Sequence, residues 1–192
     1  MRALFKHLPN FLTGLRLVSA PAVVLFLFDG NDRAAFGIFA LAGLSDAVDG
    51  FLAKRFGFVT RVGRYLDPAA DKLLIVTSFV ALSMMHMAPL WITGIVLGRD
   101  LAIVLGVLVV AWFELPVPVK PLFVGKISTA CQIGYVAFAL LLRSTGKDWP
   151  HALTWAAIIA AVATGVSWIG YGSLLARAIA ARLRGKTARP GM

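Results

Sequence analysis

Six apolar segments follow one another along the 192-residue chain, and each is close to the length that crosses a membrane as a helix. A transmembrane helix needs roughly 20 mostly apolar residues, with a range of about 17 to 25. The chain is 59% hydrophobic and 15% charged, whereas a soluble domain is about half apolar and about a quarter charged. We therefore predict an all-α, polytopic membrane protein with six transmembrane helices. The segments lie approximately at 11–28, 33–56, 69–87, 90–113, 122–142 and 153–179.

The first two segments have features that interrupt a plain apolar span. Pro21 lies inside the first segment and predicts a kink. The second continues into the polar sequence SDAVDGFLAKRF, so its later half has to leave the hydrocarbon or line a polar cavity. Before the first segment, RALFKHL combines apolar residues with cations, as a short N-terminal interfacial helix would.

The excess of positive charge predicts the orientation of these helices. The chain has 19 Lys and Arg against 9 Asp and Glu, and its formal net charge is +10. Six spans place both termini on one side, where all the cations except Arg33, Arg143 and Lys147 also lie. Cytoplasmic loops of membrane proteins are rich in Lys and Arg, so we expect the cytoplasmic (inner) membrane, with both termini inside the cell.

The same composition limits the other classes of protein. The cations lie between apolar segments and form no basic face with interleaved aromatic residues, which argues against nucleic-acid binding. The lone Cys131 excludes an internal disulfide and a thiolate-rich zinc site. The length suits one domain, and we expect a membrane domain over 1–182 followed by a basic cytoplasmic tail over 183–192.

Four of the nine acidic residues fall close together in the chain. Asp46 and Asp49 are three positions apart and Asp67 and Asp71 are four, so each pair lies on one face of its own helix, on adjacent turns. The intervening FGFVTRVGR contains two glycines and can fold the helices into an antiparallel hairpin. We therefore expect two carboxylates from each helix to converge.

Converging carboxylates at a membrane margin repel one another unless a cation lies among them, and ionisable residues there mark functional sites. Mg²⁺ and Mn²⁺ prefer oxygen ligands, and two such ions about 3.5–4 Å apart form a clamp used in phosphoryl displacement. Zinc is disfavoured because no His or Cys lies nearby in the sequence. Small residues at 50 and 53 leave room for a ligand, and neighbouring cations can hold phosphates. The alternative is a set of solvated interfacial residues, against which the matched spacing argues.

The run DAVDGFLAKRFGFVTRVGRYLDPAAD resembles the signature of the CDP-alcohol phosphatidyltransferases, D-x2-D-G-x2-A-R-x8-G-x3-D-x3-D. One position departs from it, because Lys54 stands where the family usually has Arg. Lysine keeps the charge but lacks the two-pronged donor geometry of a guanidinium, so Arg55 is a candidate to share phosphate contact. The positions that match in identity and spacing are Asp46, Asp49, Gly50, Ala53, Gly63, Asp67 and Asp71.

The resemblance implies a six-helix membrane enzyme whose site opens to the cytoplasmic half of the bilayer. In such an enzyme an alcohol attacks the lipid-linked phosphorus of a CDP-lipid and CMP leaves. By resemblance, Asp46, Asp49, Asp67 and Asp71 bind two divalent metal ions, Mg²⁺ or Mn²⁺, and Asp71 is also the catalytic base. Homodimers are common in this family. The positions implied to contact the CDP-lipid donor are Gly50, Ala53, Lys54, Thr60 and Gly63.

Longer stretches bear on the acceptor alcohol. FALAGLSDAVDGFLAK, LDPAADKLLIV, LGRDLAIVLGV and VKPLFVGKISTACQI resemble the CMP-forming cardiolipin synthases, which join CDP-diacylglycerol to phosphatidylglycerol. PNFLTGLRLVSAP is shared more broadly with phosphatidylglycerophosphate synthases, which use glycerol 3-phosphate. The pair Arg99 and Asp100 favours the first group, because glycerophosphate-using relatives more often have Arg-Glu there.

Several alternatives stay open at this stage. Arg99 and Asp100 either contact substrate, stabilise the helix as a pair, or reach the interface by a snorkelling arginine, as Arg16 can. A transporter that binds a cation is a second class of function, and a pseudo-enzyme that binds CDP-lipid is a third, raised only by Lys54. A further set of polar residues follows successive turns of the fifth segment, and suits either an acceptor headgroup or hydrogen bonds between helices. Its members are Lys126, Ser128, Thr129 and Gln132.

Overall fold

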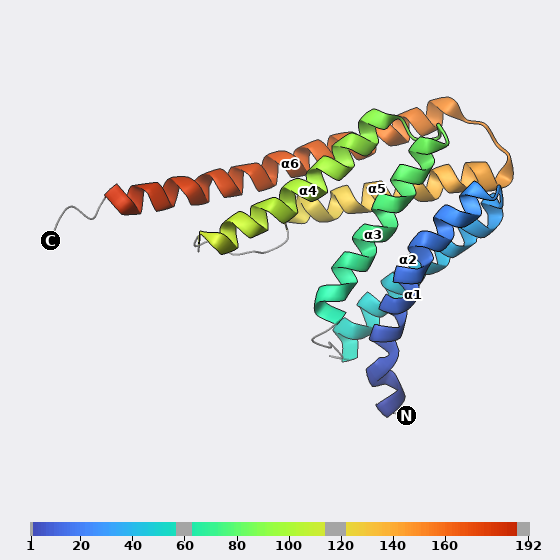
Figure 1. Ribbon diagram of the computed structural model, residues 1–192, viewed down its shortest axis with the longest axis horizontal. Helices are drawn as coiled ribbons and strands as arrows, with labels where there is room; N and C mark the ends of the chain where they lie inside the picture. Colours follow the sequence, from blue (N-terminus) through green and yellow to red (C-terminus); the bar gives the residue numbers. More distant parts are fainter. Residues whose placement is uncertain (1, 57–62, 114–121, 188–192) are drawn as a thin grey trace. The chain divides into compact units, whose positions relative to one another are not determined.

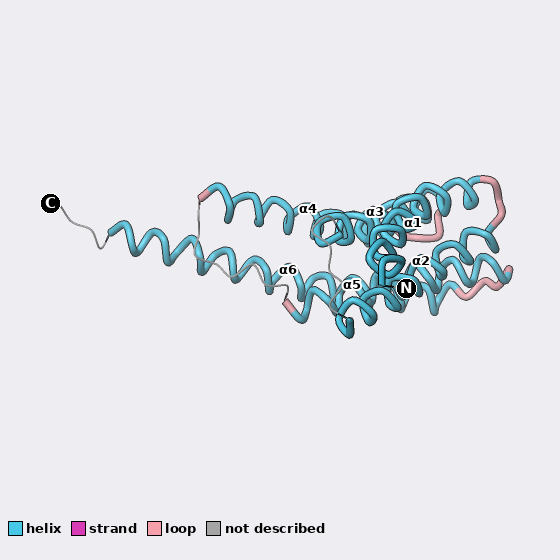
Figure 2. The backbone as a smooth tube through the Cα atoms, turned by 90° about the horizontal axis from the view of Figure 1, so that it is seen from below, coloured by secondary structure: helices cyan, strands magenta, loops and turns pink. Residues whose placement is uncertain are grey.

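The computed structural model describes residues 2–56, 63–113 and 122–187, and within them the regular structure is entirely helical (Figure 1). Figure 2 shows the same helices, with short loops at residues 29–31, 85–89 and 146–149. Side chains are described outside positions 2–13, 46–71, 111, 178, 181 and 183–187. The helices of the described residues are α1 (Arg2–Phe28), α2 (Asp32–Phe56), α3 (Gly63–Met84), α4 (Leu90–Trp112), α5 (Phe123–Thr145) and α6 (Pro150–Thr187).

The helices follow the six predicted segments in order, which confirms the all-α class. The N-terminal interfacial helix differs from its prediction, because α1 continues from Arg2 through Pro9 to Phe28 without a break. The helix continues although Pro9 and Asn10 separate RALFKHL from the apolar segment. Helix α6 continues to Thr187, five residues into the predicted tail.

Three helices of the described residues have the length and composition to cross a membrane. These stretches are Leu90–Val110, Phe123–Thr145 and Pro150–Arg177. Among the residues whose side chains are described, α1 and α3 contribute the apolar stretches Gly14–Phe28 and Lys72–Met84. The chain is thus a multi-pass membrane protein, and the number of six spans stays a prediction.

The chain forms two compact units, and each draws on distant parts of the sequence. One unit consists of residues 1–89 and 133–154, and the other of residues 90–132 and 155–192. This division into contact units does not test the predicted membrane domain over 1–182 and tail over 183–192, which stay a prediction.

In the first unit, α1 packs against both α2 and α3. Leu27 of α1 and Phe79 of α3 are buried in its core. The ring of Phe79 stacks on Tyr135 of α5, with centroids 5.5 Å apart, and the Tyr135 hydroxyl donates to the Met87 carbonyl at 3.2 Å. These contacts fix the later half of α5 to the end of α3.

At one end of this unit, two polar contacts join the start of α2 to the end of α5. Asp32 forms an ion pair with Arg143, and the Nε of Arg33 donates to the Ser144 carbonyl at 3.4 Å. Each side chain of the ion pair is about a quarter exposed, with values of 23% and 24%. The ion pair and hydrogen bond thus connect segments that lie 111 positions apart in the sequence.

Candidate active site

The four predicted metal ligands lie on two helices of the first unit. Asp46 and Asp49 are on α2, and Asp67 and Asp71 are on α3. Both helices are continuous there, so each pair keeps the one-turn separation that the sequence predicted. The end of α2 and the start of α3 lie at the same end of this unit (Figure 1). No ligand is more than ten residues, about 15 Å of helix, from that end.

The side chains of these carboxylates lie outside the described residues, so their convergence stays a prediction. The same holds for the predicted donor contacts Gly50, Ala53 and Lys54 on α2 and for Gly63, where α3 begins. Thr60 lies outside the described residues altogether. The backbone therefore supports the placement of the motif on a helix pair, and the assigned roles are proposals.

In the second unit, a buried arginine is the centre of a polar cluster. Arg99 of α4 is 4% exposed, and its Nη1 forms an ion pair with Asp100 at 2.7 Å. Its Nε and Nη2 both donate to the Ser167 hydroxyl of α6, at 3.3 and 3.2 Å. Nη2 also donates to the Gly125 carbonyl at 3.4 Å, and the guanidinium carbon lies 5.8 Å from the centre of the Tyr171 ring. Arg99 therefore joins α4, α5 and α6 and does not extend toward an interface.

Gly125 is the position where α5 approaches this cluster most closely. A Cβ atom there would lie 2.8 Å from the Tyr171 hydroxyl oxygen and 3.1 Å from Arg99 Nη2, which is closer than side chains pack. The Tyr171 hydroxyl accepts a hydrogen bond from the Leu122 amide at 3.2 Å. Tyrosine thereby satisfies one of the amides that the start of a helix leaves without a helical partner. Only glycine leaves space for these contacts.

A second polar cluster connects α5 to α6 close by. Ser128 and Gln132 of α5 and Thr164 of α6 are fully buried. The Gln132 amide donates to Thr164 at 3.0 Å and to Ser128 at 3.3 Å, and the two hydroxyls are 3.1 Å apart. Thr129 donates to the Gly125 carbonyl within its own helix at 3.1 Å. Hydrogen bonding between helices, one of the two interpretations of these residues, is therefore confirmed for Ser128 and Gln132.

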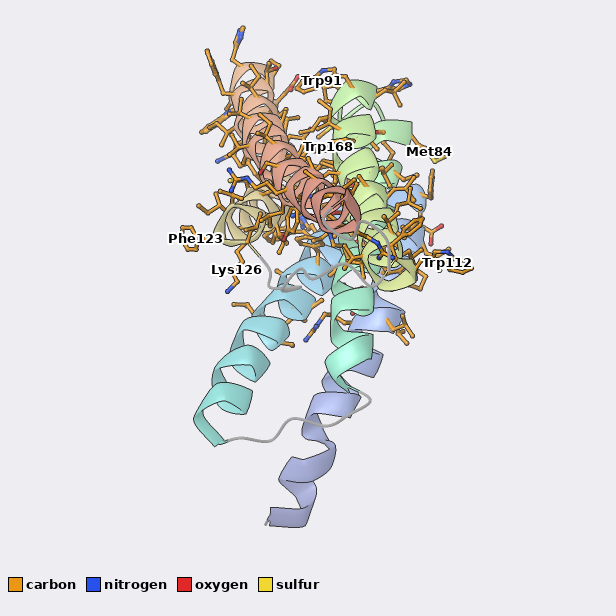
Figure 3. The ribbon with its side chains drawn as sticks, turned by 90° about the vertical axis from the view of Figure 1, so that its left-hand side faces the viewer. Met84, Trp91, Trp112, Phe123, Lys126 and Trp168 are labelled. Carbon is orange, nitrogen blue, oxygen red and sulfur yellow. The ribbon has the colours of Figure 1, made fainter. Side chains whose placement is uncertain are left out.

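Lys126 differs from these residues because it is exposed. Together with Phe123, it points away from α4 and α6 (Figure 3). An ammonium group on a membrane-spanning helix needs water, a headgroup or a counter-charge nearby. Lys126 thus remains a candidate to contact a polar substrate group.

One residue differs from its sequence-based prediction, and three buried contacts were not predicted. Arg16 is buried, at 3% exposure, instead of reaching an interface. Thr164, Ser167 and Tyr171 were not identified from the sequence. Their spacing of three and four residues puts them on one face of α6. Three polar groups on one face of an apolar helix are a sequence signal that would have predicted a buried contact.

The sequence model of the CDP-alcohol phosphatidyltransferases matches residues 6–168 of the chain. The chain belongs to this family. As a CDP-alcohol phosphatidyltransferase, it is a CMP-forming transferase of phospholipid biosynthesis, which confirms the predicted family and enzyme class. The matched range includes the whole acidic motif and the Arg99 cluster up to Ser167.

Relatives of this phosphatidyltransferase are named for two different activities, phosphatidylglycerophosphate synthesis and cardiolipin synthesis. A probable phosphatidylglycerophosphate synthase of Mycobacterium tuberculosis is 35% identical over 176 residues, which cover 88% of this chain and 82% of that protein. A CMP-forming cardiolipin synthase of Streptomyces coelicolor is 36% identical over 174 residues, covering 88% and 76%. The human CMP-forming cardiolipin synthase is 33% identical over 149 residues, covering 69% and 50%. Overall identity therefore does not separate the two acceptors.

Proposed function

We propose that this phosphatidyltransferase transfers the phosphatidyl group of CDP-diacylglycerol to a hydroxyl of phosphatidylglycerol, giving cardiolipin and CMP. The observation that carries the proposal is the acidic motif of α2 and α3, in a chain that matches the family over residues 6–168. The choice of phosphatidylglycerol rests on the sequence stretches that resemble cardiolipin synthases and on the Arg99-Asp100 pair.

The four proposed metal ligands suit two hard divalent cations. All four predicted ligands are carboxylates, on adjacent turns of two consecutive helices. Oxygen donors of this kind match Mg²⁺ and Mn²⁺. When bound, such ions supply neutralisation of the charge on the pyrophosphate oxygens of the donor and of the leaving CMP. We assign Asp46, Asp49, Asp67 and Asp71 to hold them.

The chain's own groups position the reactants and move the proton. We assign Asp71 to accept the proton of the acceptor hydroxyl as its oxygen attacks the phosphatidyl phosphorus. The bond from that phosphorus to the oxygen of CMP breaks, and CMP leaves with the electron pair. We assign Lys54 and Thr60 to the donor phosphates, and Gly50, Ala53 and Gly63 to positions where the donor approaches the backbone.

Lys126 is exposed at the start of α5, and its positive charge suits the phosphate of a lipid headgroup. Asp100 bonds directly to Arg99, and a glutamate would carry its carboxylate one methylene further. The length of this acidic side chain thus controls how Arg99 is held between α4, α5 and α6.

The proposed setting is the cytoplasmic (inner) membrane, with both termini and the active site on the cytoplasmic side. This orientation follows from the distribution of Lys and Arg along the chain. It agrees with the acidic motif, whose basic neighbours at 54, 55, 61 and 64 belong to the cation-rich side. CDP-diacylglycerol and phosphatidylglycerol would then both enter from the bilayer.

A second candidate is phosphatidylglycerophosphate synthesis with glycerol 3-phosphate as acceptor. It is favoured by the Mycobacterium tuberculosis relative, which matches as much of the chain as the Streptomyces relative does. The metal ligands and the donor contacts would be the same in both reactions.

An acceptor screen separates the two. Purified protein in mixed micelles receives CDP-diacylglycerol with either phosphatidylglycerol or glycerol 3-phosphate, and the lipid product and CMP are quantified together. Cardiolipin formed in equal amount to CMP supports the proposal. Product formed only from glycerol 3-phosphate contradicts it and assigns the second candidate. Release of no CMP with either acceptor would contradict both.

A further inference from the structure

Helices α4 and α6 lie alongside each other in the second unit and run in the same direction. A Cβ on Gly98 would lie 3.4 Å from the Trp168 ring, and further along, the Arg182 guanidinium lies 5.9 Å from the centre of the Phe113 ring. The two contacts are 15 residues apart from Gly98 to Phe113, which directly follows α4, and 14 residues apart on α6. The two helices therefore stay in contact and in register over about 20 Å, and Phe113 and Arg182 lie at the same height along the helix axes.

The end of α4, where Phe113 lies beside Arg182, has the features of a membrane interface. The second half of α4 exposes large apolar side chains, among them Leu101, Val104 and Leu108, which suit contact with lipid chains. The run ends at Trp112, which is 85% exposed, and Phe113, which is half exposed. Aromatic residues are enriched where a membrane span meets the headgroups. The end of α4 therefore marks the boundary of the hydrocarbon.

Cations of α6 lie at and just below the same boundary. Arg182 is partly exposed beside Phe113, and Arg177 is exposed five residues earlier, about 7.5 Å along the helix. An arginine side chain is long enough to bring its guanidinium from that depth to the headgroups. Helix α6 has no Asp or Glu in any of its 38 residues, and its sequence continues with Arg184 and Lys186. The end of the helix is thus strongly positive.

We propose that this end of the second unit, formed by Trp112 at the end of α4, by Phe113 directly after it and by Arg177 and Arg182 of α6, binds the headgroups of anionic phospholipids. Guanidinium groups donate to phosphate oxygens in a forked geometry, and cations near a membrane surface attract anionic lipid. The aromatic side chains fill the boundary between headgroup and acyl chain. None of the four residues is assigned to catalysis, so this surface is separate from the proposed reaction.

The test compares lipid retention by the full-length protein without any CDP-diacylglycerol. Protein in detergent is incubated with an equimolar mixture of phosphatidylcholine and phosphatidylserine, and bound lipids are counted by native mass spectrometry. We expect phosphatidylserine to be preferred, and Arg177→Gln/Arg182→Gln to reduce that preference about thirty-fold. Arg177→Lys/Arg182→Lys should keep most of it, because the charge is retained. Raising ammonium acetate from about 0.1 M to about 0.5 M should weaken the preference.

The matched control is Arg33→Gln/Lys147→Gln, which removes two exposed cations of the first unit and should leave the preference unchanged. An equal loss in this control would overturn the proposal, because net charge alone would then explain the binding. An unchanged preference in Arg177→Gln/Arg182→Gln would also overturn it. Equal competition by millimolar inorganic phosphate would show a phosphate site and not a lipid surface. Since no donor is present, these outcomes do not depend on the proposed reaction.

Discussion

The Ser167 hydroxyl accepts hydrogen bonds from two nitrogens of Arg99, with Nε and Nη2 at 3.3 and 3.2 Å. A single small side chain on α6 thus fixes the plane of a guanidinium on α4, 68 positions away in the sequence. Charged groups inside a membrane protein are stable only when such partners are present. This contact therefore holds a buried cation in place between α4 and α6.

Replacing Ser167 with alanine should destabilise the protein by about 1–3 kcal/mol, because Nε of the buried Arg99 loses its acceptor and Nη2 keeps only the Gly125 carbonyl. The measurement is thermal unfolding in detergent, followed by tryptophan fluorescence. Ser173→Ala is the matched control, since the exposed Ser173 hydroxyl donates only to the Gly170 carbonyl of its own helix, at 2.9 Å. Equal melting temperatures for the two variants would contradict the importance of the Arg99 contact.

Gly125→Ala should lower stability more than other glycine substitutions on the same helix. The added methyl group would overlap the Tyr171 hydroxyl and crowd Arg99. Combining it with Tyr171→Phe should recover part of the loss, since the nearest atom is then removed, and a double-mutant cycle measures that coupling. Gly134→Ala on α5 serves as the control, because a Cβ there would meet no atom within 4 Å. Additive effects of the two substitutions would argue against direct contact.

Asp71→Asn should reduce CMP release at least about a hundred-fold, because the amide can neither accept the proton nor bind a cation as a carboxylate does. Chelation of divalent metal ions should abolish activity in the parent enzyme, and either Mg²⁺ or Mn²⁺ should restore it. The assay follows CMP chromatographically, with folding checked by size-exclusion profile. Asp148→Asn, at an exposed position before α6, should remain fully active. Activity of Asp71→Asn within a few-fold of the parent would remove Asp71 from the mechanism.

The ion pair between Asp32 and Arg143 should stabilise the first unit by about 0.5–1 kcal/mol, as expected for a partly exposed pair. Asp32→Asn and Arg143→Gln should each lower the melting temperature slightly, and the double variant should lose little more than either single one. The reversed pair, Asp32→Arg/Arg143→Asp, should recover part of the stability. Catalytic activity should change little in all of them. A fully additive double variant would show that the two groups do not interact.

The sequence predicted the order and type of the helices because each apolar segment is long and bounded by polar residues. Its predicted span from Leu90 to Phe113 differs from α4 by one residue at the end. Helix ends with mixed composition were less well predicted, as α6 shows by continuing to Thr187. Spacing along one helix also located Asp46 and Asp49, and Asp67 and Asp71, on adjacent turns.

Contacts between helices could not be predicted in the same way. The polar residues of α5 were noticed, but their partner Thr164 was not, since apolar periodicity does not tell which faces of two lipid-exposed helices meet. Arg99 likewise had three possible roles until Ser167, Gly125 and Tyr171 were found around it. A single sequence contains the local pattern, whereas these pairings depend on the packing of the whole unit.

The length of α6 has a consequence for the membrane in which the enzyme works. Its 38 residues extend about 57 Å, while the hydrocarbon of a bilayer is about 30 Å thick. The helix must therefore tilt, protrude, or thicken the lipid around it, and each response changes with bilayer thickness. Because Ser167 and Tyr171 belong to this helix, its tilt is coupled to the position of Arg99. The acyl-chain length of the host lipid is consequently an experimental variable for this enzyme, even when that lipid is not a substrate.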